Sequence, residues 1–205
     1  YSQGKPYKPV EVVGDADDTG TIVTFHPDPE IFQVTTIYKY DTLAARLREL
    51  AYLNKGIRLT LTDKRNLVND VDENGNELET THFRSDVFYS KDGLKEFVEY
   101  LDGGAEKLIE SPIYLETDKI IPIEIALQYN TSYTEKIYSY VNNINTIEGG
   151  THLQGFKMGL TRTLKNYADK AGMLAKLKFD LAADDFREGL TAVVSVKVAE
   201  PQFEG

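Results

Sequence analysis

The sequence predicts an α+β fold whose second half is a mixed β-sheet with helices on one face. A long amphipathic helix is indicated between residues 148 and 170, because apolar side chains recur there at steps of three or four. They are Leu153, Phe156, Leu160, Leu164 and Tyr167. Alternating apolar residues predict strands, the first three as an antiparallel meander. The strands span 113–116, 120–129, 135–141 and 190–198, with a further β-like piece near 176–180.

Composition is that of a globular protein without a membrane-spanning segment. The 205 residues are 41% hydrophobic and 27% charged, which is ordinary for a soluble domain. No stretch approaches the roughly 18 apolar residues that a membrane span needs, and the start resembles no signal peptide. We therefore expect a cytoplasmic protein with no membrane partner.

Cysteine and histidine usage argues against several kinds of site. The sequence has no cysteine, which excludes disulfides, thiolate metal sites and a cysteine nucleophile. Its three histidines, His26, His82 and His152, are far apart and have no metal-ligand spacing. We expect no metal site in this chain.

Charge is distributed unevenly along the chain. The formal net charge is −10, and most of the acidic excess lies in residues 1–106. Residues 152–178 reverse this trend, with six Lys or Arg against one acidic residue. On the predicted helix, Lys157, Arg162 and Lys165 lie opposite the apolar side. They form either a solvated helix face or a local basic surface near phosphates, and spacing alone does not choose between the two.

The first half begins with an irregular, acidic stretch and then a short strand. β-Branched residues alternate after Thr19 and Pro27 ends the run, so we predict a strand at about 20–26. A second strand, from Ile57 to Thr62, is predicted from its alternating apolar and polar side chains.

A helix is predicted between these two strands, at about 42–54, with Asp41 as its N-cap. Its apolar stripe consists of Leu43, Leu47, Leu50 and Ala51. The charged side chains that we expect to point away from this stripe are Arg46, Arg48 and Glu49.

An acidic segment further along resembles the start of a calcium-binding loop. Asp70, Asp72 and Asn74 occupy the first, third and fifth ligand positions, but Thr81 stands where such a loop needs glutamate. Asn74-Gly75 is better explained as a hairpin turn, because both residue types tolerate positive φ. We therefore predict a hairpin and no calcium site.

A short helix is predicted to start at Ser90 or Asp92 and to end at Asp102-Gly103-Gly104. The double glycine is the candidate boundary between two domains. These would span residues 1–106 and 107–205.

No catalytic constellation is recognisable in the sequence. Asp184-Asp185 is explained by a solvated turn, because adjacent side chains on an extended chain point apart. Gly149-Gly150 and Gly155 match no phosphate-loop spacing. No nucleophile elbow supports a Ser-His-Asp site.

Five stretches have unusually specific sequences. They are RLRELAYLN (46–54), NNI (142–144), EGGTH (148–152), LTRTL (160–164) and DDFREGLTAVVSVKV (184–198). Together they resemble the B subunits of type IIA topoisomerases, and GFK at 155–157 is closer to gyrase than to topoisomerase IV. The resemblance covers nearly the whole chain.

The resemblance implies that residues 1–106 are the remnant of a Bergerat-type ATPase sandwich, its C-terminal part, and that residues 107–205 form a transducer domain. It places Thr21 beside the adenine of ATP and Val23 close by. The catalytic glutamate, the Mg²⁺-holding asparagine and the lysine that reaches the γ-phosphate would lie beyond the two ends of this sequence. ATP and Mg²⁺ therefore belong to the full-length protein, and we expect neither a catalytic residue nor a bound cofactor here.

The resemblance also implies partners. In such proteins two B subunits pair on binding ATP, act with the gyrase A subunit on DNA, and relay nucleotide state to supercoiling. The candidate DNA-facing residues here are Lys157, Arg162 and Lys165.

Three alternatives remain open from the sequence. One is a topoisomerase IV B subunit. Another is a non-catalytic interaction module that shares the transducer fold, as in mismatch-repair or chaperone ATPases, although these lack the EGGTH and RLREL motifs. The third is an acidic α+β binding domain of unknown ligand, which composition alone does not exclude.

Overall fold

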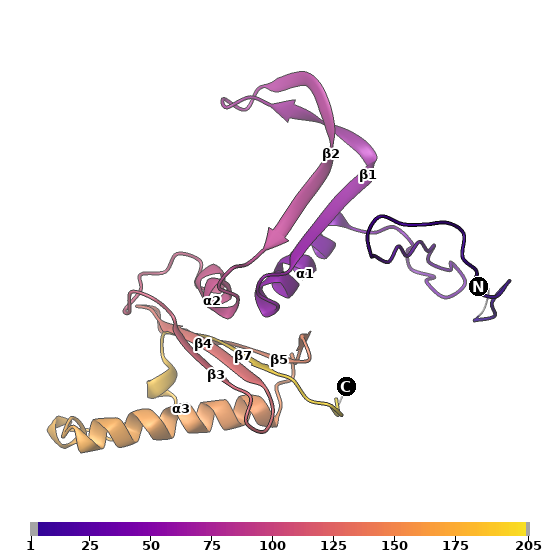
Figure 1. Ribbon diagram of the computed structural model, residues 1–205. Coiled ribbons are helices and arrows are strands. Elements are labelled where there is room, and N and C mark those ends of the chain that lie inside the picture. The colour runs from indigo at the N-terminus through magenta and orange to yellow at the C-terminus, as the bar shows by residue number, and fades with distance from the viewer. Residues whose placement is uncertain (1–3, 204–205) are drawn as a thin grey trace. The chain divides into compact units, whose positions relative to one another are not determined.

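The computed structural model describes residues 4–203 of the chain (Figure 1). The chain divides into two units, Tyr1–Tyr38 and Lys39–Gly205. Within the first unit, residues 6–38 contain neither helix nor strand. The strand predicted at 20–26 is therefore wrong. Its alternating residues find no partner strand among the described residues, and an unpaired strand is not stable in water.

The second unit begins with helix α1 (Tyr40–Leu53), followed by a long hairpin of β1 (Arg58–Val71) and β2 (Glu77–Tyr89). α1 packs on the base of this hairpin. The buried side chains of that contact are Tyr40, Ala44, Ala51 and Phe88, with Leu47, Leu59 and Leu61 partly buried around them. The helix is thus confirmed, and the first β-strand runs well past its predicted end at Thr62.

The polar residues of α1 differ from the prediction. The helix starts at Tyr40, so Asp41 lies in its first turn instead of capping it, and its carboxylate accepts a hydrogen bond from Arg84 at 2.6 Å. Arg48 does not point into solvent, because its guanidinium lies 5.5 Å from the ring centre of Phe88 and 5.7 Å from that of Tyr100. A long apolar stem lets arginine cover aromatic surface while it keeps its charge hydrated.

The hairpin turn predicted at Asn74-Gly75 is confirmed. One carboxylate oxygen of Asp72 accepts hydrogen bonds from the backbone N–H groups of Asn74 at 2.9 Å and Asn76 at 2.8 Å. Asp72 therefore acts as a turn residue.

Helix α2 (Leu94–Asp102) follows the hairpin. The sequence predicted a start at Ser90 or Asp92, and the helix begins two residues after Asp92. The hydroxyl of Ser90 accepts the N–H of Gly93 at 2.8 Å, and the carboxylate of Glu96 accepts the N–H groups of Lys91 and Asp92. The helix ends at Gly103 in a left-handed conformation, as predicted.

The mixed sheet has five strands in the order β3-β4-β7-β5-β6. Their bounds are Ile113–Thr117 (β3), Ile123–Tyr129 (β4), Lys136–Val141 (β5), Ile144–Asn145 (β6) and Leu190–Val196 (β7). β5 and β7 run parallel, and the other neighbours are antiparallel. The predicted antiparallel meander of the first three strands is therefore wrong, because β7 inserts between β4 and β5. All seven residues of β7 are buried, which favours a central position.

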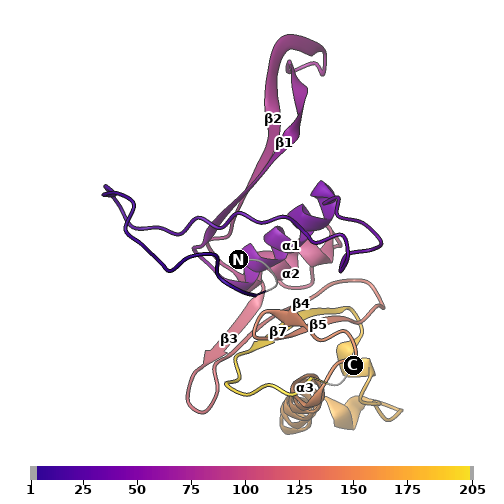
Figure 2. The same ribbon diagram turned by 90° about the vertical axis from the view of Figure 1, so that its right-hand side faces the viewer.

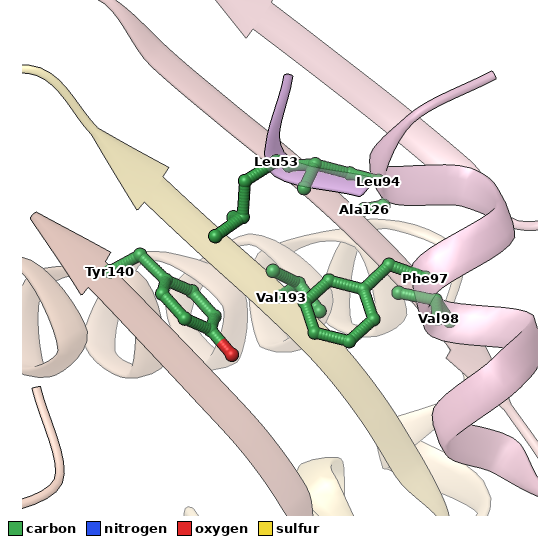
Figure 3. Close-up of a cluster of buried hydrophobic side chains, with 7 residues drawn as sticks. All are labelled: Leu53, Leu94, Phe97, Val98, Ala126, Tyr140 and Val193. Atoms are coloured by element: carbon green, nitrogen blue, oxygen red, sulfur yellow. The ribbon is translucent and has the colours of Figure 1, made fainter. Parts of the chain in front are cut away.

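Helices cover both faces of this sheet, so the prediction of helices on one face is wrong. The end of α1 and α2 cover one face, where Leu53, Leu94, Phe97 and Val98 meet Ala126, Tyr140 and Val193 (Figure 3). Helix α3 (Thr151–Lys170) covers the other face (Figure 2). There Phe156 and Leu160 pack against Leu127, Leu190 and Ala192. The predicted α3–sheet contact is confirmed.

A short 3₁₀ helix, Leu174–Lys176, and irregular chain up to residue 180 follow α3. The β-like piece predicted near 176–180 is wrong. Leu177 and Phe179 are 39% and 66% exposed, so their apolar side chains do not add to the sheet. No helix of the described residues is long and apolar enough to cross a membrane.

Buried polar contacts fix the start of β7. The carboxylate of Asp102, at the end of α2, accepts hydrogen bonds from Asn130 and Thr191, each at 2.6 Å. All three residues are at most 3% exposed. Gly189 passes so close to this site that an added Cβ would lie 2.3 Å from the carbonyl oxygen of Asn130.

We expect Gly189→Ala to lower the free energy of unfolding by about 2 kcal/mol or more, because Gly189 has φ of 70° and no room for a methyl group. Urea denaturation measures this change. The control is Gly155→Ala on α3, where nothing lies within 4 Å of the added Cβ. It should raise stability by about 0.5–1 kcal/mol. Equal effects of the two substitutions would contradict the prediction.

Candidate functional site

The start of α3 is held against the sheet by a chain of hydrogen bonds. His152 Nε2 lies 3.1 Å from the hydroxyl oxygen of Thr146, and that hydroxyl donates to the carbonyl of Ser139 at 2.9 Å. Gly150 precedes the helix with φ of 152°, and a Cβ there would lie 2.9 Å from the His152 ring. The Gly-Thr-His motif therefore lets the backbone pass close to an imidazole that anchors α3 to β5.

The His152 imidazole is partly buried, and this burial lowers its pKa below the ordinary value of 6.5. Its Nε2 shares a hydrogen bond with the Thr146 hydroxyl, and the imidazole tautomer sets which of the two atoms donates. The arrangement suits an uncharged structural histidine.

An ion-pair network joins the middle of α3 to the start of β5 and to the turn before β7. Its centre is Glu135, whose carboxylate pairs with Lys157 on α3 and with Arg187. The Nε atom of Arg187 donates to Glu135 at 2.8 Å. One acidic side chain thus holds together two basic ones from different parts of the sequence.

Arg187 is 9% exposed and has every part of its guanidinium engaged. Its Nη1 donates to the carbonyl of Ala183 at 2.9 Å and to the hydroxyl of Thr161 at 3.2 Å, and its Nη2 pairs with Asp184. The 3₁₀ turn Asp185–Arg187 presents this side chain to the helix. Sequence reasoning missed Arg187, and its only signal was a lone basic residue within an acidic turn.

The two basic partners decide the charge state of Glu135. Burial works to raise the pKa of its carboxyl, but the hydrogen bonds and charges of Lys157 and Arg187 outweigh burial, so the pKa lies below the ordinary value of 4.5. The same contacts with Glu135 and Asp184 outweigh the burial of Arg187 and raise its pKa. Glu135 and Arg187 are therefore both charged at neutral pH.

The three candidate DNA-facing residues are not equivalent in the structure. Lys157 is half-buried and paired with Glu135. Arg162 and Lys165 are exposed, and among residues 4–203 neither forms an ion pair. A helix has 3.6 residues per turn, so Lys157 and Arg162 lie about 140° apart around the axis, whereas Arg162 and Lys165 share a side. The exposed basic surface of α3 is therefore centred on Arg162 and Lys165.

The two candidate adenine-side residues lie in the first unit. Thr21 and Val23 are exposed on irregular chain, Val23 by 76%. Within the described part of the chain, no three His, Asp or Glu side chains gather in a way that could hold a metal ion.

Sequence comparisons with known proteins point to the DNA gyrase B family. The family model described as DNA gyrase B matches residues 93–205. The DNA gyrase B subunit of Eisenibacter elegans is 60% identical over 206 residues, covering 100% of this chain and 41% of that protein. The DNA gyrase B subunit of Clostridium acetobutylicum is 51% identical over 207 residues, covering 100% of this chain and 30% of that protein.

Solved structures give the same fold. The 43K ATPase domain of Thermus thermophilus gyrase B, in complex with an aminocoumarin, matches with a TM-score of 0.70 and 36% identity, covering 87% of this chain and 44% of that chain. The B subunit of Myxococcus xanthus gyrase matches with a TM-score of 0.62 and 22% identity, covering 83% of this chain and 43% of that chain. At this identity the match supports the fold alone.

The fold and these matches define the class: B-type subunits of type IIA topoisomerases, which have an ATPase domain of this architecture. The chain belongs to the DNA gyrase B family. It spans 41% of the length of the Eisenibacter relative and 30% of that of the Clostridium relative.

We expect Glu135→Gln to lower the free energy of unfolding by about 2 kcal/mol at pH 7, because it removes the charged acceptor of two basic side chains. Because folding lowers the pKa of Glu135, its stabilising contribution is complete above about pH 4.5 and disappears as the pH falls through the folded-state pKa. Urea titrations from pH 7 to pH 3 measure both effects.

The matched control for this substitution is Glu188→Gln, which removes the same charge from an exposed residue without an ion pair in the described structure. Its stability should change by less than about 0.5 kcal/mol. A Glu135 variant as stable as this control at neutral pH would contradict the role given to the network.

Proposed function

We propose that this chain is the relay region of a gyrase B subunit, which passes movement driven by nucleotide binding to the parts that handle DNA. One observation carries the proposal. The end of α1 and α2, from the first half of the chain, share a buried core with β4, β5 and β7 from the second half (Figure 3). Close-packed side chains transmit displacement, because protein interiors have low compressibility.

The domain division at residue 106 is part of this proposal. Residues before it would belong to the ATPase domain, and residues 107–205 would form the transducer. The core that joins Phe97 to Val193 supports tight coupling between the two. A displacement of α2 would therefore reach the sheet and α3 without a flexible link.

ATP and Mg²⁺ enter the proposal through the full-length protein. The family relationship supports an ATP-dependent topoisomerase that acts in the cytoplasm with the gyrase A subunit on DNA, and whose B subunits pair when ATP binds. Thr21 and Val23 would then reach the adenine only when further parts of the protein surround them. Because the resemblance places the catalytic glutamate, the Mg²⁺-holding asparagine and the γ-phosphate lysine outside these residues, we assign them no step of ATP hydrolysis.

The exposed basic surface of α3 is the proposed DNA-facing side. Within the described residues Arg162 and Lys165 form no ion pair there, whereas Lys157 is engaged with Glu135 and contributes through the position of the helix. Because the whole chain has a net charge of −10, attraction to phosphates must come from such a local surface.

We expect the double substitution Arg162→Ala and Lys165→Ala in the intact protein to weaken duplex DNA binding. The loss of two phosphate contacts should reduce the slope of log K against log salt by about 1.8. Fluorescence anisotropy over a salt series measures it. The control removes two exposed charges elsewhere, Lys64→Ala and Lys91→Ala, and should leave the slope unchanged. Equal slopes for the two double variants would contradict the assignment of this surface.

The proposed division of labour also makes a prediction about ATP hydrolysis. A protein that consists of these 205 residues alone should show no ATPase activity, because phosphoryl transfer depends on positioned charges and metal ions that the described residues do not supply. A coupled assay on the purified chain tests this. ATP turnover that persists through further purification would contradict the proposed division of labour.

A further inference from the structure

The turn between β5 and β6 contains two consecutive asparagines in the left-handed conformation. Asn142 has φ of 51° and Asn143 has φ of 65°. Asparagine is favoured in such two-residue hairpin turns, because it tolerates positive φ. A turn of this kind needs only the backbone, yet both side chains here make contacts with distant segments.

Asn142 holds the chain that leaves β7. Its amide nitrogen donates to the carbonyl of Val198 at 2.8 Å, and its amide oxygen accepts the N–H of Val198 at 2.9 Å. Its backbone N–H donates to the carbonyl of Val196 at 2.9 Å. Both polar atoms of the side chain are therefore paired with one backbone position, 56 residues further along the chain.

Asn143 holds the end of α1. Its carbonyl accepts a hydrogen bond from Nη2 of Arg46 at 2.8 Å, and its amide nitrogen donates to the side-chain oxygen of Asn54 at 3.0 Å. Asn54 in turn donates to the carbonyl of Leu50 within α1 at 2.8 Å. The turn is thus bonded to both the side and the end of this helix.

We propose that Asn142 and Asn143 are positioning residues that form a joint between α1 and the chain leaving β7. Within the joint, Arg46 is the α1 residue that holds the turn in place. A displacement of α1 then moves the turn, and the turn moves residues 197–199. The existence of the joint does not depend on the proposed function, but its use in the relay rests on that function.

The two halves of the joint are unequal. The amide of Asn142 is fully paired with Val198. The amide oxygen of Asn143 is buried and has no hydrogen-bond partner among the described residues, and a buried unpaired acceptor offsets much of what the bond to Asn54 contributes. The charged hydrogen bond from Arg46 is therefore the main attachment of α1 to the turn.

Hydrogen exchange of the Val198 amide in the intact gyrase B protein tests the joint. Arg46→Ala should raise that exchange rate by about five-fold or more, although Arg46 does not contact Val198. Asn143→Gly, which keeps the turn conformation and removes the amide, should raise it in the same direction. The amide of Val193, in the buried core, should be unaffected by either and reports whether the fold is intact.

The matched control is Arg48→Ala, on the same helix two residues away. Arg48 lies over the rings of Phe88 and Tyr100, and the hydrogen bond from α1 to the turn comes from Arg46 instead. It should leave the exchange rate of Val198 unchanged. An Arg46 variant that also leaves Val198 unchanged, or an Arg48 variant that changes it equally, would overturn the joint.

The same variants distinguish the presence of the joint from its use in the relay. With the joint in use, Arg46→Ala should reduce supercoiling per ATP hydrolysed several-fold while ATP hydrolysis itself changes little. Faster exchange at Val198 with normal supercoiling per ATP would support the joint and overturn its use in the relay, while the relay through the core of α2 and the sheet would stand. Unchanged exchange would overturn the joint, whatever the supercoiling result.

Discussion

The structure depends on the insertion of β7 between β4 and β5. All seven residues of β7 are buried, so the strand needs a hydrogen-bonded neighbour on each edge and a helix layer on each face. Those layers come from different parts of the sequence: α2 and the end of α1 on one face, α3 on the other. One central strand therefore makes a single body out of segments that are far apart in sequence.

Buried polar groups fix the position of β7 within this apolar core. At the start of β7, the buried carboxylate of Asp102 binds Asn130 and Thr191, so the end of α2 is joined to the ends of β4 and β7. Beyond the end of β7, Asn142 pairs with the backbone of Val198. Burial holds the layers together without specifying their register, whereas hydrogen bonds of defined geometry fix where the strand starts and where the chain leaves it.

Charge is organised in a similar way. Glu135 pairs with Lys157 and Arg187 at the side of α3, while Arg162 and Lys165 on the exposed side have no such partners within residues 4–203. A helix that is basic in sequence thus divides into a structural half and a solvent-facing half. This division makes a DNA-facing surface chemically reasonable in a chain that is acidic as a whole.

Local patterns in the sequence were sufficient to predict α1, α2, α3, the Asn74-Gly75 turn and the family. Each of these depends on residues close together in the chain. The strand order, the contacts of Arg46 and Arg48, and the network of Arg187 were decided only by tertiary structure. Arg46 meets a residue 97 positions away and Arg187 one that is 52 away, and nothing in a local pattern encodes such a partner. The predicted strand at 20–26 failed for the same reason: alternation indicates that a segment can pair, but only another segment close in space lets it do so.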